Sequence, residues 1–194
     1  ASGLPLVASD PHIAFGSISC WYEAHLSGAG FNVAGTGYAG VPGLLFGRNE
    51  KVAWGLTNNI CAQRDLYKEK ENPEKPGYYL YNGQWEQAVK TTATITVKGQ
   101  SPVTRTIRRT RNGPIVDEII PEAASHTGPV SLRWMGEDPC DEISSMLDMN
   151  RANTANEFRK ALRPWIVPTF SFVFADQFLA HVEVMQPKPL ATPP

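Results

Sequence analysis

The sequence predicts a β-rich α+β fold, because hairpin signals outnumber helical ones along the chain. Residues 82–83, Asn-Gly, separate the aromatic run 78–81 from residues 84–86, and Asn-Gly is the preferred pair for a type I′ turn between two strands. Residues 91–98 alternate threonines with apolar side chains, and residues 104–109 continue as a second strand after a Gly- and Pro-containing connection, which predicts a second hairpin.

A third hairpin is predicted between residues 44–47 and 52–55, two short apolar runs joined by the polar residues 48–51. Each run ends in a glycine, Gly47 or Gly55. A glycine inside a strand indicates a bulge, the close approach of another backbone or a ligand, or a barrel-like bend of the strand. This segment therefore reads as a site held on a hairpin.

The helical signals lie in the last third of the chain. Residues 143–147 carry apolar side chains at helical spacing, and Thr154 with Glu157 forms a capping box before a second helix that Pro164 ends. Phenylalanines alternate over residues 170–174, as in a strand. Their rings fit a core position or the lining of an acyl-binding pocket.

Composition narrows the function classes. The chain has 194 residues, 42% of them hydrophobic, and a net charge of -1. This length suits one core, so a single domain is expected. The balanced charge argues against a nucleic-acid-binding protein, which needs a basic surplus. The most apolar stretch, residues 165–175, is broken by Pro168, so no membrane partner is expected.

The cysteines argue against a zinc site. Cys20, Cys61 and Cys140 are an odd number without C-x-x-C spacing. At most one disulfide could form among them.

Several motifs, in order along the chain, resemble the penicillin acylase family of N-terminal-nucleophile amidohydrolases. They include PGLLFGRN and VAWGLTN within residues 40–67, ending in Asp-Leu-Tyr, which resemble the family's PG...G.N..IAWG.TN pattern. The other matches are LVASDPH at 6–12, WYEAHL at 21–26, NGPIV at 112–116, SLRW at 131–134 and the VFAD ending of 168–176.

The resemblance implies part of a four-layer αββα sandwich. Residues 1–194 would be a single partial domain, the N-terminal portion of the nucleophile-bearing beta chain, with a disordered tail at 187–194. In this family an N-terminal serine, exposed by self-cleavage of a zymogen, uses its own α-amine as general base. Ala1 has no nucleophilic atom, so that serine is expected upstream, and the chain alone is expected to be inactive.

Three candidate catalytic residues follow from the resemblance. His12 falls where the family has a histidine or glutamine close to the nucleophile, although it also fits a buried histidine held by backbone partners. Asn58 falls on the position whose backbone N–H contributes to the oxyanion hole. Ser171 falls where the family has the asparagine that supplies the second oxyanion donor, and its hydroxyl reaches less far than an amide.

Asp65 is the candidate metal ligand. The family binds a structural calcium partly through aspartates at this point, but Ala62, Gln63 and Arg64 precede Asp65 here. Calcium needs several oxygen ligands, so a salt bridge of Arg64 with a nearby acid remains the alternative. No cofactor is required for the chemistry.

The function that the resemblance implies is hydrolysis of a linear acyl amide, such as a β-lactam side chain or an N-acyl homoserine lactone, with a role in antibiotic biosynthesis or resistance. The alternative is a non-catalytic scaffold or ligand-binding β domain. Expected partners are an acyl-amide small molecule and a complementary alpha chain or the rest of the beta chain, with self-association as a further option. A periplasmic or secreted location is expected from the resemblance.

Overall fold

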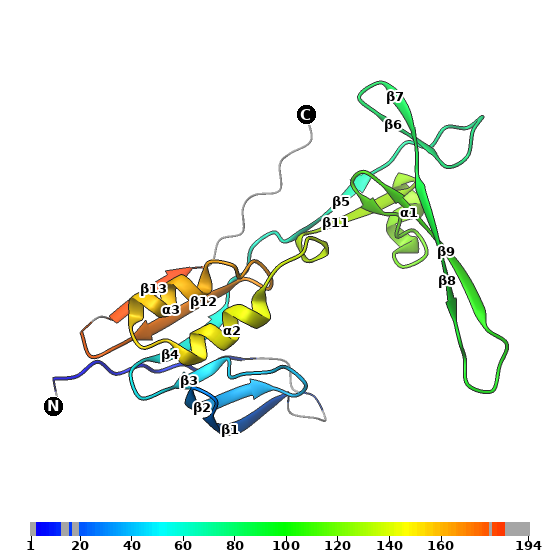
Figure 1. Ribbon diagram of the computed structural model, residues 1–194. Helices are drawn as coiled ribbons and strands as arrows, with labels where there is room; N and C mark the ends of the chain where they lie inside the picture. The colour runs from blue at the N-terminus through cyan, green and yellow to red at the C-terminus, as the bar shows by residue number, and fades with distance from the viewer. Residues whose placement is uncertain (1–2, 13–15, 17–19, 179, 185–194) are drawn as a thin grey trace. The chain divides into compact units, whose positions relative to one another are not determined.

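In the computed structural model the chain forms two compact units (Figure 1). The first comprises Ala1–Gln63 and Gly136–Pro194, and the second comprises Arg64–Met135. The structure describes residues 3–12, 16, 20–178 and 180–184. The expected single partial domain stays a prediction, and the expected tail at 187–194 lies outside the described residues.

A six-stranded sheet forms the first unit, with strand order β1-β2-β3-β4-β12-β13. Every neighbouring pair in it is antiparallel. The strands are β1 (Trp21–Gly28), β2 (Phe31–Tyr38), β3 (Phe46–Arg48), β4 (Ala53–Asn58), β12 (Phe170–Ala175) and β13 (Ala180–Val184). The sheet thus places a strand from the end of the chain, β12, directly beside β4.

The predicted hairpin at 44–55 is confirmed as β3 and β4, and both of its glycines allow a close approach. A Cβ on Gly47 would lie 2.3 Å from the carbonyl oxygen of Ala34 on β2, and its φ of 154° also suits glycine. A Cβ on Gly55 would lie 2.2 Å from the Cβ of Ser9. The N-terminal segment therefore lies against β4.

Two helices, α2 (Glu142–Arg151) and α3 (Ala155–Leu162), cover one face of this sheet (Figure 1). The predicted cap of α3 is confirmed, since the Thr154 hydroxyl accepts a hydrogen bond from the N–H of Glu157 at 3.1 Å. The reciprocal bond of the Glu157 carboxylate goes to the N–H of Asn153 instead. Pro164 follows the end of the helix as predicted.

Aromatic rings form the core between the sheet and the helices. Phe158 of α3 is fully buried, and its ring centroid lies 5.3 Å from that of Trp54 and 4.8 Å from that of Phe174. Trp54 and Phe174 are Cα partners on neighbouring strands. Because side chains alternate across a strand, Trp54, Phe172 and Phe174 all face the helices.

A buried amide ties α2 to the loop before β3. Asn150 accepts a hydrogen bond from the N–H of Leu44 at 2.7 Å and donates one to the carbonyl of Leu44 at 2.8 Å. Both residues are almost inaccessible to solvent. This pair of hydrogen bonds fixes the helical layer relative to the sheet.

The second unit is built of hairpins and one short helix. Its elements are β5 (Arg64–Lys68), β6 (Tyr78–Tyr81), β7 (Gln84–Gln87), β8 (Val89–Ile95), β9 (Val103–Thr110), β10 (Gly113–Pro114), α1 (Pro121–Thr127) and β11 (Val130–Trp134). Asn82 and Gly83 both have positive φ, which confirms the predicted turn between β6 and β7. The predicted second hairpin is confirmed as β8 and β9.

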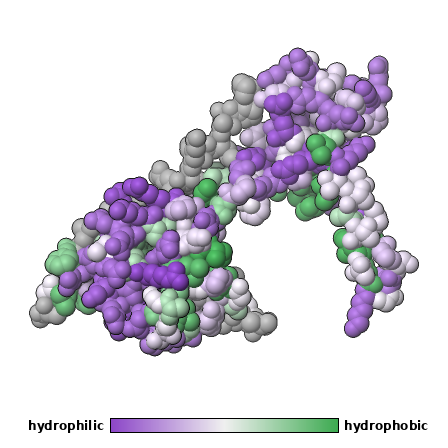
Figure 2. All heavy atoms as spheres, viewed as in Figure 1, coloured by the Kyte–Doolittle hydropathy of each residue, from purple (hydrophilic) through white to green (hydrophobic). Residues whose placement is uncertain are grey.

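The β8–β9 hairpin leaves apolar side chains exposed. One face carries the exposed residues Val89, Ile95, Val103 and Ile107 together with Arg105 and Arg109, and Figure 2 shows hydrophobic residues along this hairpin. The opposite face carries mostly threonines.

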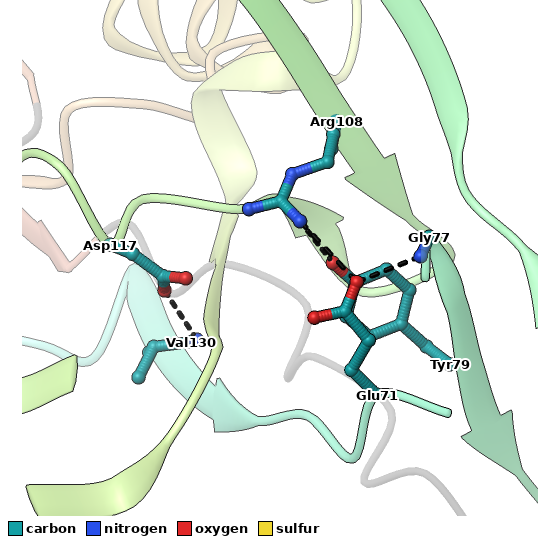
Figure 3. A network of polar contacts seen from close by, with 6 residues as sticks. All are labelled: Glu71, Gly77, Tyr79, Arg108, Asp117 and Val130. Atoms are coloured by element: carbon teal, nitrogen blue, oxygen red, sulfur yellow. Dashed lines mark hydrogen bonds and ion pairs between the residues drawn. The ribbon is translucent and has the colours of Figure 1, made fainter. Parts of the chain in front are cut away.

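Polar networks hold the second unit together. The carboxylate of Glu71 accepts hydrogen bonds from the N–H of Gly77 and, at 3.5 Å, from Arg108, which also donates to the Tyr79 hydroxyl (Figure 3). Close by, Glu69 is buried, and its Oε1 accepts from three neutral side chains, Thr110, Asn112 and Ser131. These groups satisfy one another, so we assign them a structural role.

The described residues include no helix long and apolar enough to span a membrane. All three cysteines are free.

Candidate active site

The face of the six-stranded sheet opposite the helices carries the candidate site. Phe172 faces the helices, so its neighbours Ser171 and Val173 face the other way. Ser171 is the Cα partner of Thr57 on β4, and Val173 is the partner of Gly55. We call this whole side of the sheet the helix-free face; on β4 and β12 it carries small side chains.

Asn58 ends β4 next to Ser171, so the sheet brings these two predicted residues together. Asn58 is the Cα partner of Phe170, and the N–H of the following residue, Asn59, donates to the carbonyl of Thr169 at 3.1 Å. In an antiparallel pair, only alternate residues point their backbone groups at the partner strand. The N–H of Asn58 therefore lies on the edge of β4 that faces away from β12.

The N-terminal segment lies along that same edge. The Ser9 hydroxyl donates to the carbonyl of Leu56 at 3.1 Å, and the alternation of backbone groups places this carbonyl on the same side of β4 as the Asn58 N–H. Contact between Ser9 and Gly55 is so close that only glycine fits at 55. A close approach at this glycine is therefore present, but the approaching group is a side chain, where a backbone or a ligand was expected.

His12 follows three residues later on this segment, and its side chain is 86% exposed. Its Nε2 lies 3.4 Å from a carboxylate oxygen of Asp10. The alternative of a buried histidine held by backbone partners is therefore wrong, because the chain here runs over the surface of the unit. Its proposed role near a nucleophile stays a prediction.

A polar cluster around the buried Thr169, where β4 meets β12, was not expected from the sequence. The Thr169 hydroxyl donates to the carbonyl of Asn59 at 2.8 Å and accepts from the side-chain amide of Gln63 at 2.8 Å. The thiol of Cys61 lies 3.0 Å from the same oxygen. No local pattern signals this cluster, because Thr169 lies more than one hundred residues from each of its partners in the sequence.

A cluster of aromatic rings also lies on the helix-free face. Trp21 and Tyr38 are Cα partners on β1 and β2, and their rings stack with centroids 4.3 Å apart. The Trp21 ring meets the ring of Phe46 edge-on at 4.7 Å. Phe46 precedes Gly47, which pairs with the helix-facing Trp54, so alternation places Phe46 on the opposite face.

The rings of 170–174 do not share this position. Phe170, Phe172 and Phe174 are buried and contact Trp165 or Phe158 on the helical side. Of the two interpretations of these phenylalanines, the core position is confirmed, and the acyl-pocket lining stays a prediction.

Asp65 belongs to the second unit, on β5, and it is exposed. Its Cα partner on β11 is Arg133, which places opposite charges across the strand pair. Among the described residues, no group of three or more histidine, cysteine or acidic side chains could hold a metal ion. Calcium binding at Asp65 stays a prediction.

Glu142 fixes the loop that leads into β12. Its carboxylate accepts hydrogen bonds from the N–H of Ile166 at 3.0 Å and of Val167 at 2.9 Å. Burial raises the pKa of Glu142, but hydrogen bonds from the Cys140 thiol and these N–H groups outweigh burial and hold the pKa below its usual value. The same bond to Glu142, with burial and nearby acids, raises the pKa of Cys140 to about 11.

Comparison with known proteins gives consistent matches. The family model described as penicillin amidase matches residues 1–180. The chain is 36% identical to penicillin G acylase of Escherichia coli over 88% of its own length and 20% of that protein. It is 29% identical to the acyl-homoserine lactone acylase QuiP of Pseudomonas aeruginosa over 91% of its own length and 22% of that protein.

A solved structure is similar as well. The thermostable penicillin G acylase of Alcaligenes faecalis superposes with a TM-score of 0.72 at 27% identity. The match covers 86% of this chain and 29% of that one. The chain therefore spans about a fifth of the length of the curated relatives that it matches.

Proposed function

The chain belongs to the penicillin amidase family, and from that premise we propose that it forms part of an amidohydrolase that cleaves linear acyl amides through an acyl-enzyme. The likeness to penicillin G acylase confirms the predicted α+β fold class, that of the N-terminal-nucleophile hydrolases. Named relatives act on penicillin G or on acyl-homoserine lactones. Either substrate offers an acyl chain joined by an amide bond.

One observation carries the proposal: the end of β4 lies between Ser171 on β12 and the N-terminal segment. In the proposed reaction, the hydroxyl of a terminal residue preceding Ala1 attacks the acyl carbonyl, and its α-amine takes the proton. An α-amine with a pKa of about 7.7–8.0 is partly neutral at working pH. The carbonyl oxygen becomes an oxyanion, which the N–H of Asn58 and the hydroxyl of Ser171 would stabilise.

Collapse of this intermediate breaks the C–N bond, and the proton held by the α-amine passes to the leaving amine. Water then attacks the acyl-enzyme and releases the carboxylic acid. The aromatic cluster of Trp21, Tyr38 and Phe46 is suited to the apolar acyl chain, because it lies on the same face of the sheet as Ser171.

The second candidate is a non-catalytic scaffold or ligand-binding domain. This candidate is favoured by serine at position 171, where the family pattern has asparagine. A serine hydroxyl reaches less far from the backbone than the side-chain amide of asparagine. The exposed apolar side chains of the β8–β9 hairpin would suit further polypeptide of the same protein in either case. For the first candidate, the amidohydrolase, we also propose secretion to the periplasm and self-processing.

The test is hydrolysis by the product of the full-length gene. Penicillin G and an N-acyl homoserine lactone are incubated with the purified protein, and the released primary amine is quantified. Ser171→Ala should lower kcat about 10²-fold or more if this hydroxyl is an oxyanion donor. Binding of the acyl compounds without amine release would instead favour the scaffold.

A further inference from the structure

The hydrogen-bonding capacity of Thr169 is completely used at the end of β4. A threonine hydroxyl has one proton to donate and two lone pairs to accept with. Its proton goes to the carbonyl of Asn59 at 2.8 Å, and the Gln63 amide donates to one lone pair at 2.8 Å. The thiol of Cys61, 3.0 Å away, must therefore be the donor to the second lone pair.

The same threonine holds Asn59 by its other backbone group as well. The N–H of Asn59 donates to the carbonyl of Thr169 at 3.1 Å, so both backbone polar groups of Asn59 bond to one residue. Thr169 itself is only 2% exposed, and in such surroundings water does not replace a lost partner. The peptide that follows Asn58 is thus fixed firmly to β12.

The loop that brings Thr169 to this place is also restrained. Glu142 accepts hydrogen bonds from the N–H groups of Ile166 and Val167, and the indole N–H of Trp165 donates to the carbonyl of Pro168 at 2.8 Å. The clamp on Asn59 is therefore anchored in the helical layer.

We propose that Thr169 is a positioning residue, whose hydroxyl clamps the Asn59 carbonyl and thereby orients the Asn58 N–H for the oxyanion. This inference rests on the proposed function and adds to it a residue that does not touch the substrate. An oxyanion donor acts only when it is held in place before the charge develops. Thr169 would supply that preorganisation from the β12 side of β4, opposite the edge on which the Asn58 N–H lies.

The experiment compares Thr169→Val and Thr169→Ser in the full-length protein, with kcat and KM measured for amide hydrolysis and corrected for the fraction of active sites. Valine keeps the shape but removes the hydroxyl, so kcat should fall about 10- to 100-fold, the range for a displaced catalytic group, while KM changes less than about twofold. Serine keeps the hydroxyl and should restore kcat to within about threefold of wild type.

Thr154→Val is the matched control. This substitution removes the hydroxyl that caps α3, so the variant should be less thermally stable than wild type, with an unchanged kcat. If Thr169→Val does not fold, Gln63→Met replaces it: one restraint on the hydroxyl is lost, and kcat should fall about threefold to tenfold.

Two outcomes overturn the inference alone: Thr169→Val within threefold of wild-type kcat, or Thr169→Ser as impaired as Thr169→Val. An unchanged kcat in Gln63→Met overturns it where valine is not tolerated. Absence of amide hydrolysis by the wild-type protein contradicts the proposed function itself, and the inference falls with it.

Discussion

Replacing Gly55 with alanine tests whether the N-terminal segment must lie against β4. The new Cβ would lie 2.2 Å from the Cβ of Ser9 and 2.6 Å from its Oγ, whereas non-bonded carbon atoms settle about 3.5–4.0 Å apart. The segment must therefore move away by about 1.3–1.8 Å. That movement stretches the bond of 3.1 Å between the Ser9 hydroxyl and the Leu56 carbonyl beyond hydrogen-bonding range.

The expected effect is large on activity and small on stability. Under the proposed function the nucleophile precedes Ala1 on this same segment, and a displacement of about 1 Å can cost about 10²-fold in rate. We therefore expect Gly55→Ala to lower kcat/KM about 100-fold in the full-length protein. One lost hydrogen bond costs about 1 kcal/mol, so the variant should still fold.

The double variant Ser9→Gly with Gly55→Ala is the decisive control. With the Ser9 side chain removed, the nearest atom of residue 9 is its Cα, 3.5 Å from the new Cβ, an ordinary contact. The double variant should therefore recover most of the lost activity and match Ser9→Gly alone. Initial rates of amine release and thermal unfolding curves measure both effects. Activity of Gly55→Ala within threefold of wild type, or a double variant no better than it, would refute the reasoning.

Three further predictions concern the helical layer and the loop before β12. Asn150→Ala strands the N–H and carbonyl of Leu44 in the core, so the free energy of unfolding, measured with urea, should fall by about 2–6 kcal/mol; a fall below about 1 kcal/mol would contradict this. Cys140 has a pKa of about 11, so at pH 8 it should react with iodoacetamide about tenfold more slowly in the native than in the unfolded protein. The smaller fraction of thiolate in the native protein outweighs the greater nucleophilicity of that thiolate. Equal rates of modification, measured by mass spectrometry, would contradict this prediction. Because the pKa of Glu142 is lowered by folding, its ionised form stabilises the protein above the unfolded pKa of about 4.3. The stability lead of wild type over Glu142→Gln should therefore shrink as pH falls through the folded pKa, and a lead that stays constant from pH 7 to pH 3 in thermal unfolding would be inconsistent with it.

Local chemistry made part of the fold predictable. The turn at Asn82-Gly83 and the cap at Thr154 depend on neighbours only a few residues away, and both are present as predicted. The hairpin of β1 and β2 also turns on a local pair, Ala29-Gly30, with positive φ at both residues, and this signal went unused. The pairing of β5 with β11 carried no such signal. This pairing joins residues more than sixty positions apart, and their register depends on packing that no short window of sequence contains.

In the candidate site, too, some residues could be identified from the sequence and others could not. Asn58 and Ser171 could be named from motif resemblance, and the sheet places them on neighbouring strands. The Thr169 cluster could not be found, because a buried threonine has no periodicity and its partners Cys61 and Gln63 come from a distant loop. The phenylalanines of β12 were ambiguous in sequence, since alternation predicts a strand but not which face meets the helices.

The N-terminal sequence and intact mass of the protein purified from its full-length gene test the central proposal most directly. The account predicts two chains, one of which contains residues 1–194 and starts upstream of Ala1 with a serine, cysteine or threonine, and that chain should gain the mass of an acyl group when quenched during turnover of an amide substrate. A single unprocessed polypeptide that never gains this mass would contradict hydrolysis by an N-terminal nucleophile. It would favour the alternative, a non-catalytic scaffold or ligand-binding domain.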